Sequence, residues 1–223
     1  MWTLPAPPGF QGLHPDKPVM MYFRHLPHWR QEGATYSVTF RLHDSLPQAK
    51  LQELEQMRKE WERRLPTPHS DAQLEQLSQE SMRRVERWLD QGMGSCRLKD
   101  ARAARVVIDA MHYFDNQRYE LDSYVVMPNH VHAIVRPLMC QEEPLERILQ
   151  SWKRHSSREI NRQLGLTGQL WQEESFDRII RDEEHLERAI HYIGANPSKA
   201  GLTRGQCATW VRAEWVELGW KFG

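Results

Sequence analysis

His130 and His132 stand two residues apart in a run rich in β-branched residues that spans 124–135. Alternate side chains of a β-strand share a face, so this spacing predicts that both imidazoles leave the same face. Two imidazoles held one pleat apart on a rigid strand are suited to bind one divalent cation. Because 11 histidines in 223 residues produce about half of one such pair by chance, a purely structural role for the pair stays open.

A second candidate group lies on a predicted helix that begins at Asp182 and ends near Asn196 and Pro197. Asp182 is a good N-cap, and the proline marks the end. The helix buries an apolar stripe made of Leu186, Ala189, Ile190 and Ile193. A separate polar row remains, made of His185, Arg188, Tyr192 and Asn196. Tyr192 is a candidate nucleophile, and the alternative is that it packs as an amphipathic border residue.

The combination of His130, His132 and Tyr192 indicates metal-assisted phosphoryl transfer. A cation on the two histidines would bind the non-bridging oxygens of a DNA phosphate and orient the phosphorus for in-line attack. A phenol has an ordinary pKa of about 10, so Tyr192 would need a nearby cation or base to help it lose its proton. Attack would leave a phosphotyrosine linkage and free a hydroxyl on the other side of the break.

The predicted helix after Pro144 has a basic side that faces away from its apolar sector. We expect DNA contacts from this side and from two cations of the predicted strand at 175–181. The candidate DNA-binding residues are Lys153, Arg154, Arg158, Arg162, Arg178 and Arg181. An ordinary solvent-exposed face is the alternative for the helix.

The elements that must position these residues alternate along the chain. Periodicity predicts strands over 34–42, 118–126, 130–136 and 175–181, and helices over 100–115 and 144–164. The resulting order is β-α-β-β-α-β.

We predict a single domain with three additions to this order. Residues 1–20, rich in proline, form an extended arm. Residues of about 66–98 form a helical insertion, in which a helix over 72–90 carries many charges that we interpret as a solvated face. Residues 203–223 form a C-terminal tail, and its three tryptophans dock the terminus on the body.

The composition excludes several classes of protein. Thirty Lys and Arg balance 30 Asp and Glu, so the formal charge is zero and any basic surface must be local. Three distant cysteines fit neither a disulfide framework nor a Cys-x-x-Cys metal site, and they predict a reducing compartment. The chain shows no signal-peptide pattern and no apolar run long enough for a membrane helix. We therefore expect a soluble cytoplasmic protein without membrane contact.

The sequence resembles the REP-associated tyrosine transposases, relatives of the small single-tyrosine insertion-sequence transposases within the HUH endonuclease superfamily. The resemblance rests on motifs that occur in family-like order over residues 24–205. These motifs are VMPNHVH at 126–132, SWKR at 151–154, REIN at 158–161, LWQ at 170–172, SFDRIIRD at 175–182, HYIGANP at 191–197 and KAGL at 199–202.

By this resemblance, His130 and His132 bind the metal, Tyr192 is the nucleophile, and Asn196 stands where relatives place a third ligand, often Gln. The resemblance implies Mg²⁺ or Mn²⁺ as cofactor. It also implies an α+β fold, a ferredoxin-like antiparallel sheet with helices on one face, which agrees with the predicted order. Relatives cleave and rejoin single-stranded or hairpin DNA of repetitive extragenic palindromes. The implied protein is a monomer or homodimer, cytoplasmic and nucleoid-associated.

Three other functions stay open. A replication initiator or relaxase-type nickase uses the same metal and tyrosine but lacks the Tyr-Ile-x-x-Asn-Pro context of residues 192–197. A DNA-binding regulator without catalysis would keep only the affinity for DNA. The third alternative is that His130, His132 and Tyr192 are structural. Because the global charge is zero, we predict that local cations make DNA affinity fall clearly with salt.

Overall fold

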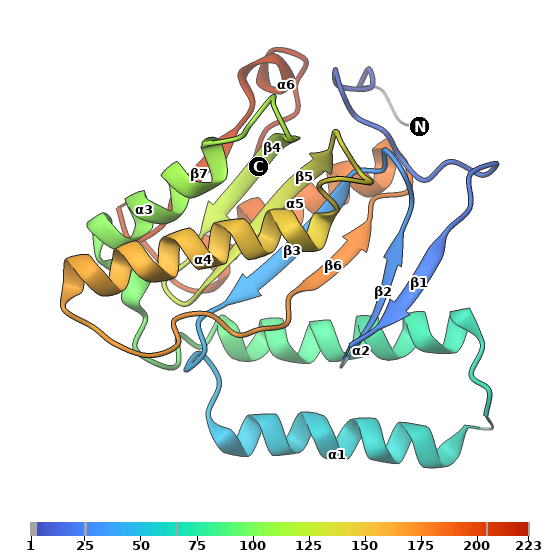
Figure 1. Cartoon of the computed structure of the whole chain (residues 1–223), viewed down its shortest axis with the longest axis horizontal. Coiled ribbons are helices and arrows are strands. Elements are labelled where there is room, and N and C mark those ends of the chain that lie inside the picture. Colours follow the sequence, from blue (N-terminus) through green and yellow to red (C-terminus); the bar gives the residue numbers. More distant parts are fainter. Residues whose placement is uncertain (1–3, 25, 66, 204, 223) are drawn as a thin grey trace.

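A five-stranded antiparallel sheet forms the centre of the protein (Figure 1). The computed structural model describes residues 4–24, 26–65, 67–203 and 205–222. The strands are β3 (Tyr36–Arg41), β4 (Tyr119–Val126), β5 (His130–Pro137), β6 (Phe176–Ile179) and β7 (Ala208–Val211), in the order β6-β3-β5-β4-β7. Residues 1–3 of the predicted arm, 66 of the predicted insertion, and 204 and 223 of the predicted tail lie outside the described residues.

Two helices connect the strands across one face of the sheet. α3 (Ala101–His112) joins β3 to β4, and α4 (Leu145–Leu164) joins β5 to β6. The four predicted strands therefore occupy the order fourth, first, third, second, which is the ferredoxin-like arrangement. The predicted α+β class and β-α-β-β-α-β order are confirmed. The crossover helices share one face, where the apolar side of β5, made of Val131, Ala133 and Val135, packs in the main core.

A third helix, α5 (Glu183–Lys199), covers the opposite face (Figure 1). Its residues Leu186, Ile190 and Ile193 pack with Val125 and Ile134 of the sheet in a second core. The helix continues through Pro197 and ends three residues later than Asn196. The sheet is thus buried on both faces, and the residues of β5 that alternate with the main-core valines face α5.

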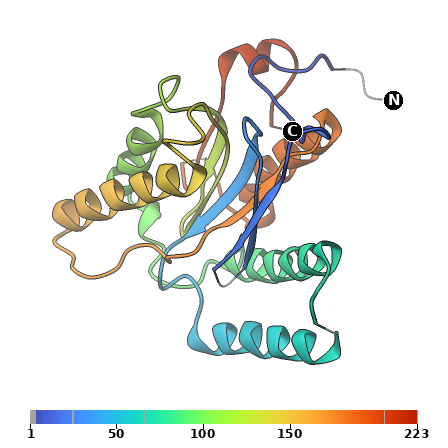
Figure 2. The same cartoon turned by 45° about the vertical axis from the view of Figure 1, so that its right-hand side comes forward.

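A helical hairpin projects from the end of β3. Its helices are α1 (Gln48–Arg64) and α2 (Asp71–Leu89), and a short 3-10 turn, η1 (Arg97–Lys99), leads on to α3. Ser70 and Gln73 close a capping box at the start of α2. α2 lies nearer the sheet and α1 lies outside it (Figure 2). No helix in the described ranges is long and apolar enough to span a membrane.

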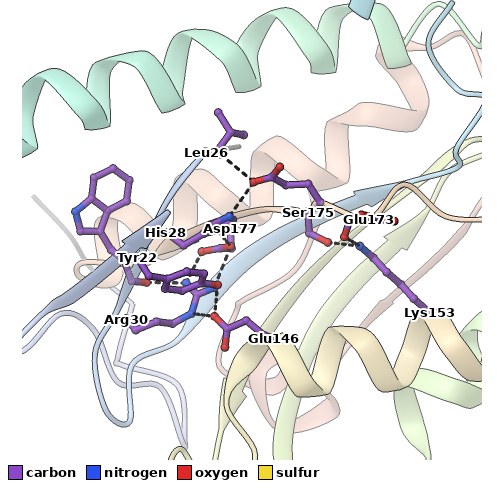
Figure 3. A network of polar contacts seen from close by, with 11 residues as sticks. Tyr22, Leu26, His28, Arg30, Glu146, Lys153, Glu173, Ser175 and Asp177 are labelled. Atoms are coloured by element: carbon purple, nitrogen blue, oxygen red, sulfur yellow. Dashed lines mark hydrogen bonds and ion pairs between the residues drawn. The ribbon is translucent and has the colours of Figure 1, made fainter. Parts of the chain in front are cut away.

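A second, two-stranded sheet lies beside β6 and was not predicted. Its strands are β1 (Met20–Phe23) and β2 (Pro27–Arg30). A buried polar network fixes this hairpin to the body (Figure 3). His28 Nδ1 lies 2.5 Å from Asp177 Oδ1, and Arg30 binds Asp177 at 2.5 Å and Glu146 at 2.6 Å. β1 and β2 are therefore held by ion pairs to β6 and α4 rather than by local propensity.

The C-terminal tail packs against the N-terminal arm and α5. It contains β7 and a short helix, α6 (Ala213–Glu217). Trp215 and Trp220 are buried, and their indole N–H groups donate to the carbonyls of Pro8 and Pro5 at 2.9 and 2.8 Å. Gly194 of α5 faces Phe222, and a Cβ there would lie 2.6 Å from the ring. The structure thus agrees with the expectation that the tryptophans dock the terminus on the body.

Candidate active site

His130 and His132 leave β5 on the face covered by α5, as their spacing predicted. Their Nε2 atoms lie 2.9 Å apart, and the two rings are nearly perpendicular at 89°. Asn196 reaches the same point from α5, with its amide nitrogen 2.9 Å from His132 Nε2. All three side chains are buried. The structure therefore brings together the three predicted metal-binding residues.

Asn129 fixes the tautomer of His130. The Asn129 amide nitrogen donates to the carbonyls of Leu89 and Met93 at 3.1 and 3.2 Å. Its carbonyl oxygen therefore faces His130 Nδ1, at 2.7 Å, and must accept a hydrogen bond. His130 then carries its proton on Nδ1 and turns the lone pair of Nε2 toward His132.

The contacts of His132 leave a conflict at its Nε2 atom. His132 Nδ1 lies 2.8 Å from the Thr39 hydroxyl, and its Nε2 faces both His130 and Asn196. A lone pair on His132 Nε2 would repel that of His130, whereas a proton there would oppose the Asn196 amide nitrogen. In addition, Asn196 Oδ1 is buried without a hydrogen-bond partner. These atoms require a proton or a cation among them, or a rotation of the amide.

A divalent ion fits this donor set. Burial lowers the pKa of His130 well below its ordinary value and that of His132 to about 3, so both rings are in the neutral, metal-binding form. Adjacent ligands of an octahedral ion, each at about 2.1 Å, lie about 3.0 Å apart, close to the separations seen here. Within the described ranges, no three His, Cys, Asp or Glu side chains form a metal-binding group, so Asn196 Oδ1 would be the third ligand.

Tyr192 lies beside this group, on the same helix as Asn196. The centroids of its ring and that of His132 are 6.2 Å apart, and Lys199 Nζ lies 4.4 Å from the Tyr192 centroid. The Tyr192 hydroxyl is hydrogen-bonded to the carboxylate of Glu86 on α2. Burial, followed by the charge of Glu86, raises the pKa of Tyr192 above its ordinary value. Burial also raises the pKa of Glu86 to about 7.

Tyr192 and Glu86 line a cleft of about 580 Å³ between α2 and α5. β6 and β2 contribute its floor, and the N-terminal arm contributes one rim. Its basic residues are Arg83, Arg178, Arg181 and Arg188, and its apolar residues include Trp29, Met82, Phe176 and Ala189. His185, which belongs to the polar row predicted on α5, also lines the cleft. The histidine pair is not part of this lining, so Tyr192 separates the cleft from the candidate metal group.

Of the six predicted DNA-binding residues, Arg178 and Arg181 lie in this cleft. Arg178 Nη2 is 3.2 Å from Glu75 Oε1 of α2, and Arg181 binds the same oxygen. The basic side of α4 lies across the sheet from Tyr192, and its three arginines, Arg154, Arg158 and Arg162, are exposed there. DNA contact by these three stays a prediction, but they are not part of this site.

The structure corrects the predicted role of Lys153 in DNA binding. Its ammonium group donates to the carbonyls of Gln172 and Glu173, both at 3.0 Å, and to Ser175 Oγ at 2.6 Å (Figure 3). All three of its N–H donors are engaged within the protein, and burial lowers its pKa to about 7. Lys153 therefore fixes the segment that leads into β6, rather than offering a charge to DNA.

Two residues of the site, Glu86 and Arg83, were not predicted. Both come from α2, whose charges we had interpreted as a solvated face. That interpretation is wrong for Glu86, which is only 8% exposed. The sequence signal that could have indicated its burial is its position between Val85 and Trp88, which are both buried. The partner of Glu86 lies more than 100 positions later in the chain, so the sequence pattern could not identify it.

Comparisons with known proteins give a distant structural similarity. No protein-family model matches this chain, and no curated protein matches it. Among solved structures, the chain is similar to that of a REP-associated tyrosine transposase bound to a REP hairpin. The two are 16% identical, the match covers 83% of this chain and 77% of that chain, and the TM-score is 0.46. The likeness concerns the family that the motifs resemble, and it is too distant to assign an activity.

Proposed function

We propose that this protein is a metal-dependent DNA endonuclease and strand transferase with a transposase-like activity. It would cleave single-stranded or hairpin DNA of repetitive extragenic palindromes through a covalent 5′-phosphotyrosine intermediate, and it would rejoin the strand. The observation that carries this proposal is that Tyr192 lies beside His130, His132 and Asn196, with its ring centroid 6.2 Å from that of His132. The class of DNA comes from the motif resemblance.

The proposed cofactor is Mg²⁺ or Mn²⁺, held by His130, His132 and Asn196. When bound, the ion would offset negative charge on the scissile phosphate. Asn129 and Thr39 contribute by holding the two imidazoles in orientation through their Nδ1 atoms, at 2.7 and 2.8 Å.

Tyr192 and Glu86 would carry the bond-making step. The Tyr192 hydroxyl attacks the phosphorus, and its proton passes to the Glu86 carboxylate, with which it is already hydrogen-bonded. The bond between the tyrosine oxygen and phosphorus forms while the bond from phosphorus to the 3′ oxygen breaks. The leaving oxygen takes a proton from water and becomes a 3′ hydroxyl. Attack by such a hydroxyl on the phosphotyrosine reverses these steps and rejoins DNA.

One tyrosine nucleophile holds one strand at a time. A complete strand exchange would therefore use a second molecule or a second cycle, which is compatible with a monomer or a homodimer.

The test is the formation of a covalent adduct. A labelled hairpin oligonucleotide is incubated with the protein and Mn²⁺ or Mg²⁺, and the mixture is separated under denaturing conditions. We expect an adduct with the wild-type protein and with Tyr113→Phe, a control at a tyrosine that is 71% exposed at the C-cap of α3. We expect none with Tyr192→Phe or without metal. An adduct that survives Tyr192→Phe would reject the proposed nucleophile.

A DNA-binding regulator without catalysis is the second candidate. It is favoured by the burial of the histidine pair and by the Glu86 carboxylate, which raises the pKa of Tyr192. Hairpin binding with no adduct in either metal would support this function.

A further inference from the structure

Glu75 of α2 occupies an anion site inside the cleft. Its Oε1 atom accepts hydrogen bonds from Arg178 at 3.2 Å, from Arg181, and from the Gln79 amide at 3.0 Å. Two guanidinium groups that converge on one oxygen form the arrangement with which arginines hold a phosphate. The carboxylate of Glu75 thus stands where a phosphate oxygen would be bound.

Glu75 and Glu86 lie on the same side of α2, because eleven residues make about three helical turns. They are about 16 Å apart along the helix axis. Glu75 meets the arginine pair of β6 and its neighbour, and Glu86 meets Tyr192. The path from the anion site to the candidate nucleophile therefore runs along one face of α2.

The walls of this path suit unpaired nucleotides. Arginines Arg83 and Arg188 are exposed at its edges, and Trp29 and Met82 present apolar surface within it. Single strands bind where cations follow the backbone and aromatic groups stack on bases. In a duplex the faces of the bases are stacked on one another, so an apolar wall cannot contact them. The lining thus favours a single strand over a duplex.

We propose that the cleft between α2 and α5 binds single-stranded DNA that leads to Tyr192, and that its backbone enters by displacing Glu75 from Arg178 and Arg181. Arg188 would hold a further phosphate, and Trp29 and Met82 would contact bases. The inference rests on the proposed function for the identity of the strand, but it concerns binding and not chemistry.

Glu75→Gln is the decisive variant, because it removes the charge that competes with DNA and leaves the helix intact. Affinity for a fluorescent single-stranded oligonucleotide, measured by anisotropy in a Tyr192→Phe background, should rise about three- to fivefold. Glu80→Gln is the matched control. It makes the same charge change on the same helix, where Glu80 pairs with Arg84 at 3.0 Å and does not line the cleft. Affinity should stay unchanged in this control.

Arg188→Ala gives the opposite expectation, a loss of about three- to tenfold in affinity. Its control is Arg105→Ala on α3. Arg105 and Arg188 are both exposed, and each pairs with an acidic residue one turn away on its own helix, at 2.8 and 2.5 Å. The Arg105 variant should bind as the parent does.

Photo-crosslinking locates the strand directly. Single strands that carry 5-iodouracil should crosslink to peptides that contain Trp29 or α2 residues 71–89. Crosslinks confined to α4, or a Glu75→Gln variant that binds no better than Glu80→Gln, would overturn the proposal. The Tyr192→Phe background of these variants lacks the proposed nucleophile. The binding outcomes therefore do not depend on covalent chemistry. If Glu75→Gln binds more tightly but the wild-type protein forms no adduct, the proposed endonuclease activity is rejected. The proposed binding of a single strand in the cleft is then still supported.

Discussion

Nε2 of His130 lies 2.9 Å from Nε2 of His132, and Asn129 holds the His130 proton on the far side of its ring. Two lone pairs do not approach this closely, so either His132 carries its proton on Nε2 and donates it to His130, or a cation lies between the rings. Burial keeps both imidazoles neutral, and a neutral His132 with its proton on Nε2 fits these contacts only if the Asn196 amide is rotated. We propose that a cation occupies this position, because it would satisfy the two Nε2 atoms and Asn196 Oδ1 at once.

Metal binding should therefore raise the melting temperature. At a metal concentration of 100 times Kd, binding adds about 2.7 kcal/mol, or about 5–10 °C in Tm for a chain of this size. Imidazole ligands favour Mn²⁺ over Mg²⁺, so half of the shift should occur at a lower Mn²⁺ concentration. Differential scanning calorimetry with and without EDTA measures this. An equal metal-induced shift in His130→Ala/His132→Ala would show that the ion binds elsewhere.

Glu86→Gln should raise the stability of the folded protein at alkaline pH. The pKa of Glu86 is raised from 4.5 to about 7 by burial, so the folded protein loses stability as pH rises from 4.5 through 7. The glutamine variant lacks this loss. At pH 8 it should be more stable than the parent by up to about 3 kcal/mol, with no difference at pH 4. Urea unfolding at the two pH values measures this.

The same Glu86→Gln variant should form the DNA adduct at least about tenfold more slowly, because an amide cannot accept the phenol proton. Single-turnover kinetics of the adduct measure this rate. An unchanged rate would show that another group removes the proton.

His28 should make the N-terminal hairpin sensitive to alkali. Burial lowers the pKa of His28, but its hydrogen bonds to Asp177 and Glu174 outweigh burial and raise the pKa to about 9. A raised histidine pKa contributes stability that is complete below pH 6.5 and is lost as pH rises through 9. The difference in unfolding free energy between the parent and His28→Gln should shrink over this window. A difference that stays constant from pH 6 to pH 10 would contradict the ion pair.

Asp177→Ala should be strongly destabilising because it leaves Arg30 and His28 without their shared buried carboxylate. The expected cost is about 3–5 kcal/mol. Asp109→Ala, which removes an exposed carboxylate paired with Arg105 at 2.8 Å, should change stability by less than about 0.5 kcal/mol. Chemical denaturation of the two variants gives the comparison.

DNA affinity should fall with salt despite the zero net charge. If Arg178, Arg181 and Arg188 neutralise three phosphates of a single strand, the logarithm of affinity falls with the logarithm of salt at a slope of about −2. Arg188→Ala should reduce the slope by about 0.7. Binding titrations at salt concentrations of about 50 to 200 mM measure this slope. A slope near zero would exclude backbone contacts by these arginines.

The sequence identified the central sheet and the core of the site because both follow local rules. Alternation placed His130 and His132 on one face of β5, and helical spacing placed Tyr192 and Asn196 on one row of α5. The fold then brought these two rows together where α5 packs on the sheet.

What the sequence could not show depends on contacts between distant segments. β1 and β2 are fixed by Asp177 and Glu146, which lie more than 100 positions away. From the sequence, the charges of α2 indicate a solvated face. Glu86 is buried only because the helical hairpin packs against α5. Lys153 looks like one cation of a basic helix, and only the course of residues 172–175 turns it inward.

The close approach of Gly194 to Phe222 links the C-terminal end to the spacing of the reactive groups, because Gly194 lies between Tyr192 and Asn196 on α5. A preparation clipped by proteases after Glu217 would lose the packing of Trp220 and Phe222 in the core that α5 shares with the sheet. We expect such material to give a native-like circular dichroism spectrum while the support of the helix between Tyr192 and Asn196 is weakened, so mass spectrometry of each batch should precede any assay.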